Sequence, residues 1–272
     1  MPNVMKSSKE TTASLRQRWD ARLDRLRNLE LQPNAAREVL RFYGRVLEFQ
    51  RDLAAALLAP SNQVAVLRAQ LDLSAAPEHL DSLLSLTIQY GPAPLASHAK
   101  ELQTLDCCDK AGLLERFLSA PQRPDGPEDF VVRAVLQPMA EVLQIHMEVE
   151  STSKPVCPAC GGLPQLSILR PEGDGGARWL QCSFCLREWL FRRVVCPWCG
   201  EEDKEKLPRF AAEQCAHVHV YACDTCKRYL KSVDMRLVGR AVPLVDEVAM
   251  VSLDLWTVEQ GFQKINLNLM GF

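Results

Sequence analysis

Apolar side chains recur every three or four residues through the first part of the chain, which predicts amphipathic helices. Leu15, Trp19, Leu23, Leu26 and Leu29 fall on one face of such a helix, and the positions between them are rich in Arg, Asp and Gln. An apolar stripe opposite a polar face is typical of a helix that packs on a core. The pattern therefore predicts a first helix that belongs to a bundle.

A second helical pattern is bounded by prolines. Pro33 and Asn34 are predicted to open this helix and Pro60 to end it, because proline is tolerated in the first turn of a helix but not in its interior. The apolar positions between them again have helical spacing: Val39, Leu40, Tyr43, Val46, Leu47, Leu53, Leu57 and Leu58.

Further helical segments are predicted at 77–90, 93–104, 106–120 and 127–150. Pro138 lies inside the last segment and is expected to kink or split it, since proline lacks the backbone N–H that a helix needs. Residues 1–150 are therefore predicted to form an all-α domain, and residues 151–155 a short linker.

The pattern changes to short apolar or alternating runs after the linker. Such runs precede and follow two of the cysteine pairs, at 178–181 and 186–194 and again at 218–222 and 227–233. Alternation and short apolar runs predict strands, and the glycine-rich stretch 171–176 predicts a turn between two of them. We expect two small β modules, at 155–194 and 195–240. The apolar tail 241–272, helix or strand, is expected to pack on the modules or the bundle. The predicted fold class is α+β.

Length and composition support a globular chain of about two domains. The 272 residues are 47% hydrophobic and carry a net charge of −2. The longest uninterrupted apolar run, 53–59, is far too short to cross a bilayer. Residues 1–19 are polar and charged and have no apolar core of a signal peptide. A cytoplasmic location without membrane insertion is therefore predicted.

Eight of the eleven cysteines form four Cys-x-x-Cys pairs. The pairs are Cys157/Cys160, Cys182/Cys185, Cys196/Cys199 and Cys223/Cys226. A tetrahedral metal ion takes four ligands, and a two-residue gap lets one tight turn, a knuckle, present two thiolates. Eight thiolates are therefore predicted to bind two metal ions.

The residues around each pair indicate which pairs belong together. The first and third pairs have a proline inside and a glycine, Gly161 or Gly200, after the second cysteine; the second and fourth have neither. This alternation is an internal repeat of about 40 residues. Sequential pairing then gives the following metal ligands: Cys157, Cys160, Cys182 and Cys185 in the first site, and Cys196, Cys199, Cys223 and Cys226 in the second. Each module would resemble a zinc ribbon or rubredoxin; a cross-braced pairing remains the alternative.

Paired cysteines can also form disulfide bonds or carry out dithiol redox chemistry. Stable disulfides need an oxidising compartment, which the predicted location does not provide. A thioredoxin-type dithiol uses one motif at a strand-to-helix turn, whereas this chain has four motifs next to predicted strands. Metal binding is therefore the favoured interpretation.

The remaining cysteines and the histidines are assigned no ligand role. Cys107 and Cys108 are adjacent in a predicted helix, so their side chains diverge, and we expect thiols of the core. Cys215 is expected either to pack in the spacer of the second module or to be a reactive thiol near the surface. His217 and His219 precede the fourth pair and are expected to be surface or supporting residues. His79, His98 and His146 are isolated on predicted helices and are interpreted as structural.

No recognisable catalytic motif stands out, so an enzyme is not predicted. The charge of residues 157–240, which contain thirteen Lys or Arg and ten Asp or Glu, bears on nucleic-acid binding. Eight thiolates and two divalent ions would turn this excess of three positive charges into a net −1, and two ferric ions into +1. Arginines such as Arg178, Arg187 and Arg228 then compensate the charge of anionic centres. Because nucleic-acid binders normally have a clear positive surplus, this function is disfavoured.

The C-terminal half resembles a known family. The segment Cys157-Pro-Ala-Cys-Gly, followed by the continuous run 178–200 and by Leu253-Asp-Leu-Trp-Thr-Val-Glu-Gln-Gly-Phe, is similar to FdhE, the formate dehydrogenase accessory protein family. The resemblance covers essentially the whole chain, but its specific part is the C-terminal half.

This resemblance implies a cytoplasmic maturation factor for respiratory formate dehydrogenases. Family members are thought to bind the catalytic subunit, which carries a molybdopterin and an iron–sulfur cluster, before it is exported folded. They are described as rubredoxin-like iron proteins, so the resemblance favours iron in both sites, with zinc as the alternative. The eight paired cysteines carry over, whereas Cys107, Cys108 and Cys215 do not.

Three hypotheses follow from these observations. The first is a non-catalytic assembly factor whose two metal centres stabilise the fold. The second is a rubredoxin-like carrier of single electrons that acts on a client enzyme, since iron changes oxidation state and zinc does not. The third, a zinc-ribbon protein that binds nucleic acid, is the least favoured. The residues specify neither the oligomeric state nor the docking surface for the client.

Overall fold

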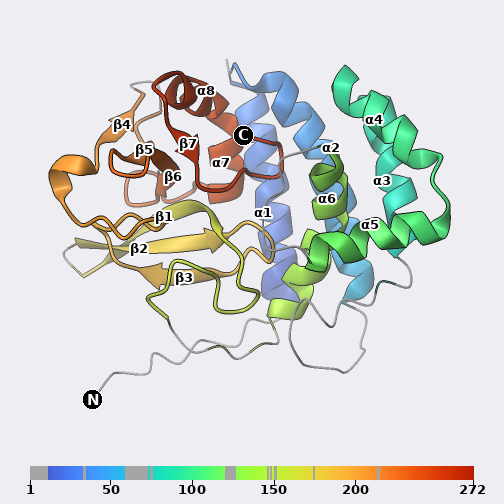
Figure 1. Ribbon diagram of the computed structural model, residues 1–272, viewed down its shortest axis with the longest axis horizontal. Coiled ribbons are helices and arrows are strands. Elements are labelled where there is room, and N and C mark those ends of the chain that lie inside the picture. The colour runs from blue at the N-terminus through green and yellow to red at the C-terminus, as the bar shows by residue number, and fades with distance from the viewer. Residues whose placement is uncertain are drawn as a thin grey trace.

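The computed structural model describes residues 12–32, 35–58, 73, 76–119, 127–145, 147, 149, 152–173, 175–212 and 215–272. Figure 1 shows a helical part and a sheet on opposite sides of the molecule, with α1 and α7 between them. The predicted α+β class, with a helical N-terminal part and a strand-rich part that contains the cysteines, is confirmed.

The N-terminal part contains the predicted helices. They are α1 Thr12–Glu30, α2 Arg37–Leu57, α3 Ala76–Tyr90, α4 Ala93–Gln103, α5 Cys107–Ser119 and α6 Pro127–Gln144. The apolar stripe predicted for α1 faces the core, since each of its five residues is at most 8% exposed. The predicted start of the second helix at Pro33 and its predicted stop at Pro60 lie outside the described residues.

Pro138 does not split its helix, because a buried side chain replaces the missing donor. α6 is continuous through Pro138, which cannot donate to the carbonyl of Ala134 four residues earlier. That carbonyl instead accepts a hydrogen bond of 2.9 Å from Nε2 of Gln50 on α2. The expected split was therefore wrong, since Gln50 supplies the donor that Pro138 lacks; the alternative expectation, a kink, stays a prediction.

One arginine that the helical pattern placed on the polar face is buried. Arg22 is 4% exposed, lies over the ring of Trp19 at 4.3 Å and binds both carboxylate oxygens of Glu141 on α6, at 2.8 and 2.5 Å. A bidentate pair of this kind fixes the mutual orientation of the two helices. Periodicity alone could not find it, because the partner lies 119 residues away.

The strands of both modules belong to one sheet. They are β1 Pro164–Glu172, β2 Gly175–Cys182, β3 Glu188–Phe191, β4 Arg209–Ala211, β5 Val218–Cys223 and β6 Arg228–Asp234. Their order is β3-β2-β1-β6-β5-β4, with a short 3₁₀ helix at Lys204–Lys206 before β4. Within each module the neighbours are antiparallel.

The two modules join through the parallel pair β1–β6, in which Leu166 is opposite Lys231 and Leu169 is opposite Asp234. The first strand of one module thus pairs with the last strand of the other, so the repeat is arranged head to tail. The domain boundaries at 150, 194 and 240 stay predictions, although hydrogen bonds of the sheet cross the middle one.

The tail contains both helix and strand, which its sequence left open. It forms α7 Pro243–Ala249, α8 Val251–Glu259 and β7 Gln263–Lys264, which pairs in parallel with β6. α7 packs on α1 and α2 and also on β6. As expected, the tail packs rather than hanging free, and it contacts both the sheet and the bundle.

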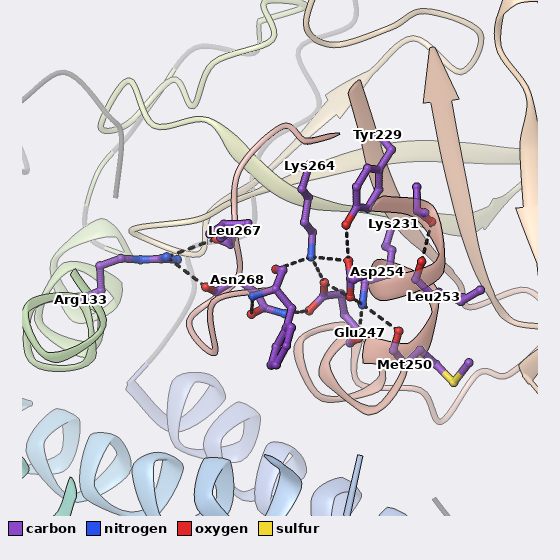
Figure 2. A network of polar contacts seen from close by, with 12 residues as sticks. Arg133, Tyr229, Lys231, Glu247, Met250, Leu253, Asp254, Lys264, Leu267 and Asn268 are labelled. Atoms are coloured by element: carbon purple, nitrogen blue, oxygen red, sulfur yellow. Dashed lines mark hydrogen bonds and ion pairs between the residues drawn. The ribbon is translucent and has the colours of Figure 1, made fainter. Parts of the chain in front are cut away.

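A buried network of charges holds the tail on the sheet (Figure 2). Lys231 on β6 is fully buried and pairs with Glu247 on α7 at 3.1 Å and with Asp254 on α8. Lys264 on β7 pairs with the same two carboxylates, and Asp254 also accepts a hydrogen bond of 2.9 Å from the hydroxyl of Tyr229. Burial disfavours the Lys264 ammonium, but Asp254 and Glu247 outweigh that effect and raise its pKa. Two cations and two anions thus neutralise each other at the junction of sheet and tail.

Candidate metal centres

The residue after the second cysteine of each knuckle has a left-handed backbone conformation. In the first and third knuckles it is glycine, Gly161 at φ 73° and Gly200 at φ 78°. In the second and fourth it is Leu186 at φ 58° and Lys227 at φ 54°, residues that adopt this region at a cost. All four knuckles therefore share one turn, although only two of them have the glycine that suits it.

Backbone hydrogen bonds repeat from knuckle to knuckle. The amide of Cys157 donates to the carbonyl of Gly162, and the amide of Cys196 donates to that of Glu201, at 2.8 and 2.9 Å. Backbone amides also point at sulfur, as from Phe184 to Cys182 Sγ at 3.3 Å and from Trp198 to Cys196 Sγ at 3.4 Å. Such donors stabilise a thiolate. The turn thus presents two sulfurs and lowers the energy of their charged form.

The knuckles bring the eight paired cysteines together as two groups of four. The first group is Cys157, Cys160, Cys182 and Cys185, and the second is Cys196, Cys199, Cys223 and Cys226. Within each group all four sulfurs lie within 4.8 Å of one another. The grouping follows the sequential pairing of the modules and not the cross-braced one.

The spacing of the sulfurs fits a tetrahedral ion and not a disulfide. Sγ–Sγ distances of 3.5 and 3.4 Å occur in the first group, and distances of 3.7 and 3.6 Å in the second. Four sulfurs at about 2.3 Å from a central ion would be about 3.8 Å apart, whereas a disulfide joins them at about 2.05 Å. Each group could therefore hold one metal ion, and four thiolates suit zinc and iron alike.

The first group is deeply buried against the helical part. Cys157, Cys182 and Cys185 are at most 2% exposed. The carbonyl of Ser183, inside the second knuckle, accepts hydrogen bonds of 3.0 Å from both Arg133 and Gln137 on α6. Helix and knuckle are thus joined by direct bonds.

Arg133 also fixes the end of the tail. Its guanidinium donates to the carbonyls of Leu267 and Asn268 at 3.2 and 3.1 Å (Figure 2), and burial lowers its pKa to about 10. One side chain therefore connects the bundle, the first cysteine group and the tail.

The second group is closer to solvent. Cys199 is exposed and Cys226 is half-buried, while Trp198 between the third pair is 39% exposed. The guanidinium of Arg228 covers the ring of Trp198 at 3.9 Å. Beside it, the carboxylate of Glu201 accepts hydrogen bonds from the Thr225 hydroxyl at 2.6 Å and from backbone amides. The two groups thus have the same sulfurs but different access to solvent.

Close packing and burial shift the pKa values of the thiols in opposite directions. Hydrogen bonds from Cys157, Cys182 and Cys185 lower the pKa of Cys160, whereas burial raises the pKa of Cys182. A bound cation would instead favour all four thiolates.

The arginines of the modules bind carbonyl and carboxylate groups. Arg178 donates to the carbonyl of Val195 at 2.9 Å, Arg187 donates to the carbonyl of Gln144 at 2.7 Å, and Arg170 pairs with Glu188. These contacts hold the backbone next to the knuckles. Their predicted role as counterions of anionic centres stays a prediction.

The expectation that Cys107 and Cys108 are core thiols was wrong. Both open α5 and are exposed, because α5 turns its first residues to solvent and buries Leu113 and Leu114 further along.

Of the isolated histidines, His79 lies on α3 and His98 on α4, where it faces Glu101 at 3.5 Å; His146 lies outside the described residues.

The other candidates near the fourth pair have partners of their own. His219 is 2% exposed and faces Arg209, and Cys215 lies beside His217, whose imidazole binds Asp246. His217 and His219 thus lie outside both groups of four, and a supporting role stays a prediction. Among the described residues, no helix is both long and apolar enough to span a bilayer.

Comparison with known proteins places these groups in a family context. The family model for the central domain of FdhE matches residues 156–193, and the model for the FdhE C-terminal domain matches residues 194–270. The two matched segments contain all eight grouped cysteines.

Similar proteins extend the comparison beyond these segments. "Protein FdhE homolog" from Aquifex aeolicus is 34% identical over 193 residues, which are 70% of this chain and 68% of that protein. The homologue from Haemophilus influenzae strain PittGG is 32% identical over 130 residues, 47% of this chain and 43% of its own length. The crystal structure of the FdhE protein from Pseudomonas aeruginosa has a TM-score of 0.73 at 22% identity and covers 97% of both chains, so the whole fold is shared.

Proposed function

Because the chain belongs to the FdhE family, we propose that it is an accessory factor for the maturation of a formate dehydrogenase, and that it binds the catalytic subunit in the cytoplasm. The family membership carries this proposal, together with the two cysteine groups inside the matched segments. In the described residues, hydrogen bonds from α6 join the first cysteine group to the helical part, and this suits a binding role without catalysis.

The proposal assigns one metal ion to each group of four cysteines, with iron favoured over zinc by the family. The ion would join two knuckles that lie about 25 residues apart in the chain, and in a domain this small such a bond supplies much of the folding energy. In the first group it would hold the surface to which Arg133 and Gln137 bind. Client binding is therefore expected to depend on both ions.

Binding of the purified catalytic subunit to serine variants tests this function. Cys182→Ser/Cys185→Ser should lose the first metal ion and abolish binding, because the knuckle bonded to α6 comes apart. Cys107→Ser/Cys108→Ser is the matched control, since it removes an adjacent and exposed pair outside both groups. Full-strength binding by the metal-free first variant would contradict the proposal.

Electron transfer to the client is the second candidate function, and the exposure of Cys199 favours it for the second group. A ferric ion bound there could accept one electron, whereas zinc could not. The part-exposed ring of Trp198 and the exposed sulfur would then mark where a partner approaches. A visible spectrum that bleaches reversibly on reduction supports this function, and colourless protein with stoichiometric zinc excludes it.

A further inference from the structure

A third cluster of reactive side chains lies outside both cysteine groups. It forms where the spacer of the second module meets α1 and α7. Cys215 Sγ lies 3.5 Å from Nδ1 of His217, and Nε2 of the same imidazole lies 2.7 Å from Oδ1 of Asp246. A thiol beside an imidazole whose other nitrogen binds a carboxylate is the arrangement that activates a cysteine nucleophile.

Asp246 is fixed as the orienting group. It is 1% exposed and accepts hydrogen bonds from Arg25 Nε at 2.9 Å, from Arg25 Nη2 at 2.5 Å and from the backbone amide of Val242 at 2.8 Å. Burial would raise the pKa of this carboxyl, but the bonds to His217 and Arg25 outweigh it and lower the pKa. The carboxylate therefore stays charged and holds the imidazole ring in one orientation.

The cluster places a positively charged imidazole beside the thiol of Cys215. Arg25 neutralises Asp246, and the hydrogen bonds to Asp246 and Cys215 raise the pKa of His217 to about 9. The imidazole is then a cation at neutral pH, and its Nδ1 faces the Cys215 sulfur. His219 is not a second cation beside this cluster, because burial lowers its pKa to about 4 and leaves it neutral. An imidazolium next to a thiol favours the thiolate.

We propose that Cys215 is a nucleophilic thiolate, activated by His217 and oriented through Asp246, which exchanges with a disulfide bond of a partner molecule. Its Sγ forms a bond with one sulfur of that disulfide while the original S–S bond breaks. The other sulfur leaves as a thiolate and takes its proton from solvent, so the number of disulfides is unchanged. Neither the metal ions nor the proposed maturation role takes part in this exchange.

Access and surroundings suit this chemistry. Cys215 and His217 are both part-exposed and Asp246 is 1% exposed, so the thiol and imidazole border solvent while the carboxylate stays covered. The exposed Cys107 and Cys108 provide an internal comparison, since they are free thiols at the start of α5, far along the chain from His217.

The test measures how fast each thiol of the metal-loaded full chain reacts with iodoacetamide between pH 5 and 9.5, with the modified peptides assigned by mass spectrometry. Cys215 should react with a lower pH midpoint than Cys107 and Cys108, because an adjacent imidazolium favours its thiolate. His217→Gln should move the Cys215 midpoint up to that of the other two. His98→Gln, which removes an imidazole elsewhere, should leave it in place.

Incubation with glutathione disulfide then tests exchange itself. Cys215 should form the mixed disulfide at pH 6.5 several-fold faster than Cys107 or Cys108, because a lowered thiol pKa raises the thiolate fraction more than it reduces nucleophilicity. Far-UV circular dichroism and metal content confirm that each variant is folded. A Cys215 that is unreactive at every pH, or whose midpoint equals that of Cys107 and ignores His217→Gln, would overturn the proposal and leave a purely structural hydrogen-bond chain.

Discussion

Single backbone conformations set the geometry of the cysteine groups. Gly161, Leu186, Gly200 and Lys227 all close their knuckles with positive φ, and only the two glycines do so without a steric cost. Glycine follows both Cys-Pro-x-Cys pairs in the sequence, and glycine adopts this conformation readily. The sequence could not predict the same turn at Leu186 and Lys227, because nothing local favours a left-handed conformation there.

Gly200→Ala should therefore destabilise the second module through backbone strain alone. An added Cβ would meet no atom within 4 Å, but φ of 78° costs a non-glycine residue about 1–2 kcal/mol. The measurement is the urea midpoint of the metal-loaded protein. Gly112→Ala in α5 is the control and should stabilise by about 0.5–1 kcal/mol, as usual inside a helix. Equal stability of Gly200→Ala and the unmodified chain would argue against a strained turn.

His217 should make stability depend on pH. Its folded-state pKa of about 9 lies above its unfolded value near about 6.5, so its contribution is fully present below pH 6.5 and is lost as pH rises through 9. The chemical-denaturation midpoint should fall over this window, and His217→Gln should flatten that part of the profile. An unchanged slope in the variant would show that the Asp246 contact adds no pH-dependent stability.

The surroundings of two other residues could not be predicted from the sequence, because their partners lie far away along the chain. The helical pattern placed Arg22 on the surface, whereas Glu141 from α6 binds it in the interior; Pro138 suggested a break, whereas Gln50 supplies a donor. The exposed Cys107 and Cys108 were misplaced because adjacency in a helix does not say which face is buried. For Arg22 and Pro138 the decisive interaction joins two elements, and no periodicity records it.

At the scale of elements, the helices and the strands beside the knuckles were predictable and their connections were not. Apolar spacing predicted α1 to α6, and alternation predicted β5 and β6 around the fourth pair. Nothing in the sequence of β1 or of β6 indicates that the two strands pair in parallel, since each has the pattern of a strand within its own hairpin. The tail was ambiguous because α7, α8 and β7 are each short and packed among other elements.

Breaking the charge network at one residue should detach the tail from the sheet. Lys231→Met leaves Glu247 and Asp254 buried with only Lys264 as a cation, and loss of one partner from a buried pair costs about 3–5 kcal/mol. Hydrogen exchange at α8 and the urea midpoint report the effect.

The double variant Lys231→Met/Asp254→Asn restores charge balance and is the control. It should be less destabilised than the sum of its two single changes, because the two residues share one network. Additive single effects would mean that Lys231 and Asp254 act independently.

At the scale of the whole molecule, the two cysteine groups are expected to lose metal at different rates. The first is covered by α6 and Arg133, whereas Cys199 opens the second to solvent. A chelator should therefore remove metal in two phases, the faster one from the second group. Cys199→Ser should abolish the fast phase alone and leave the helical circular dichroism unchanged. One uniform phase would contradict this assignment.

The head-to-tail pairing of the two modules also affects how readily copies of the chain could pair through their sheet edges. A sheet in which the first strand of one unit pairs with the last strand of the next has two different edges that match, and such contacts can continue into filaments. Here the outer strands are β3, with four residues, and β4, with three, while β6 is internal and pairs with β1, β5 and β7. Edges this short offer few backbone groups to another chain. The pairing that unites the two modules is therefore disfavoured at the outer edges of the same sheet.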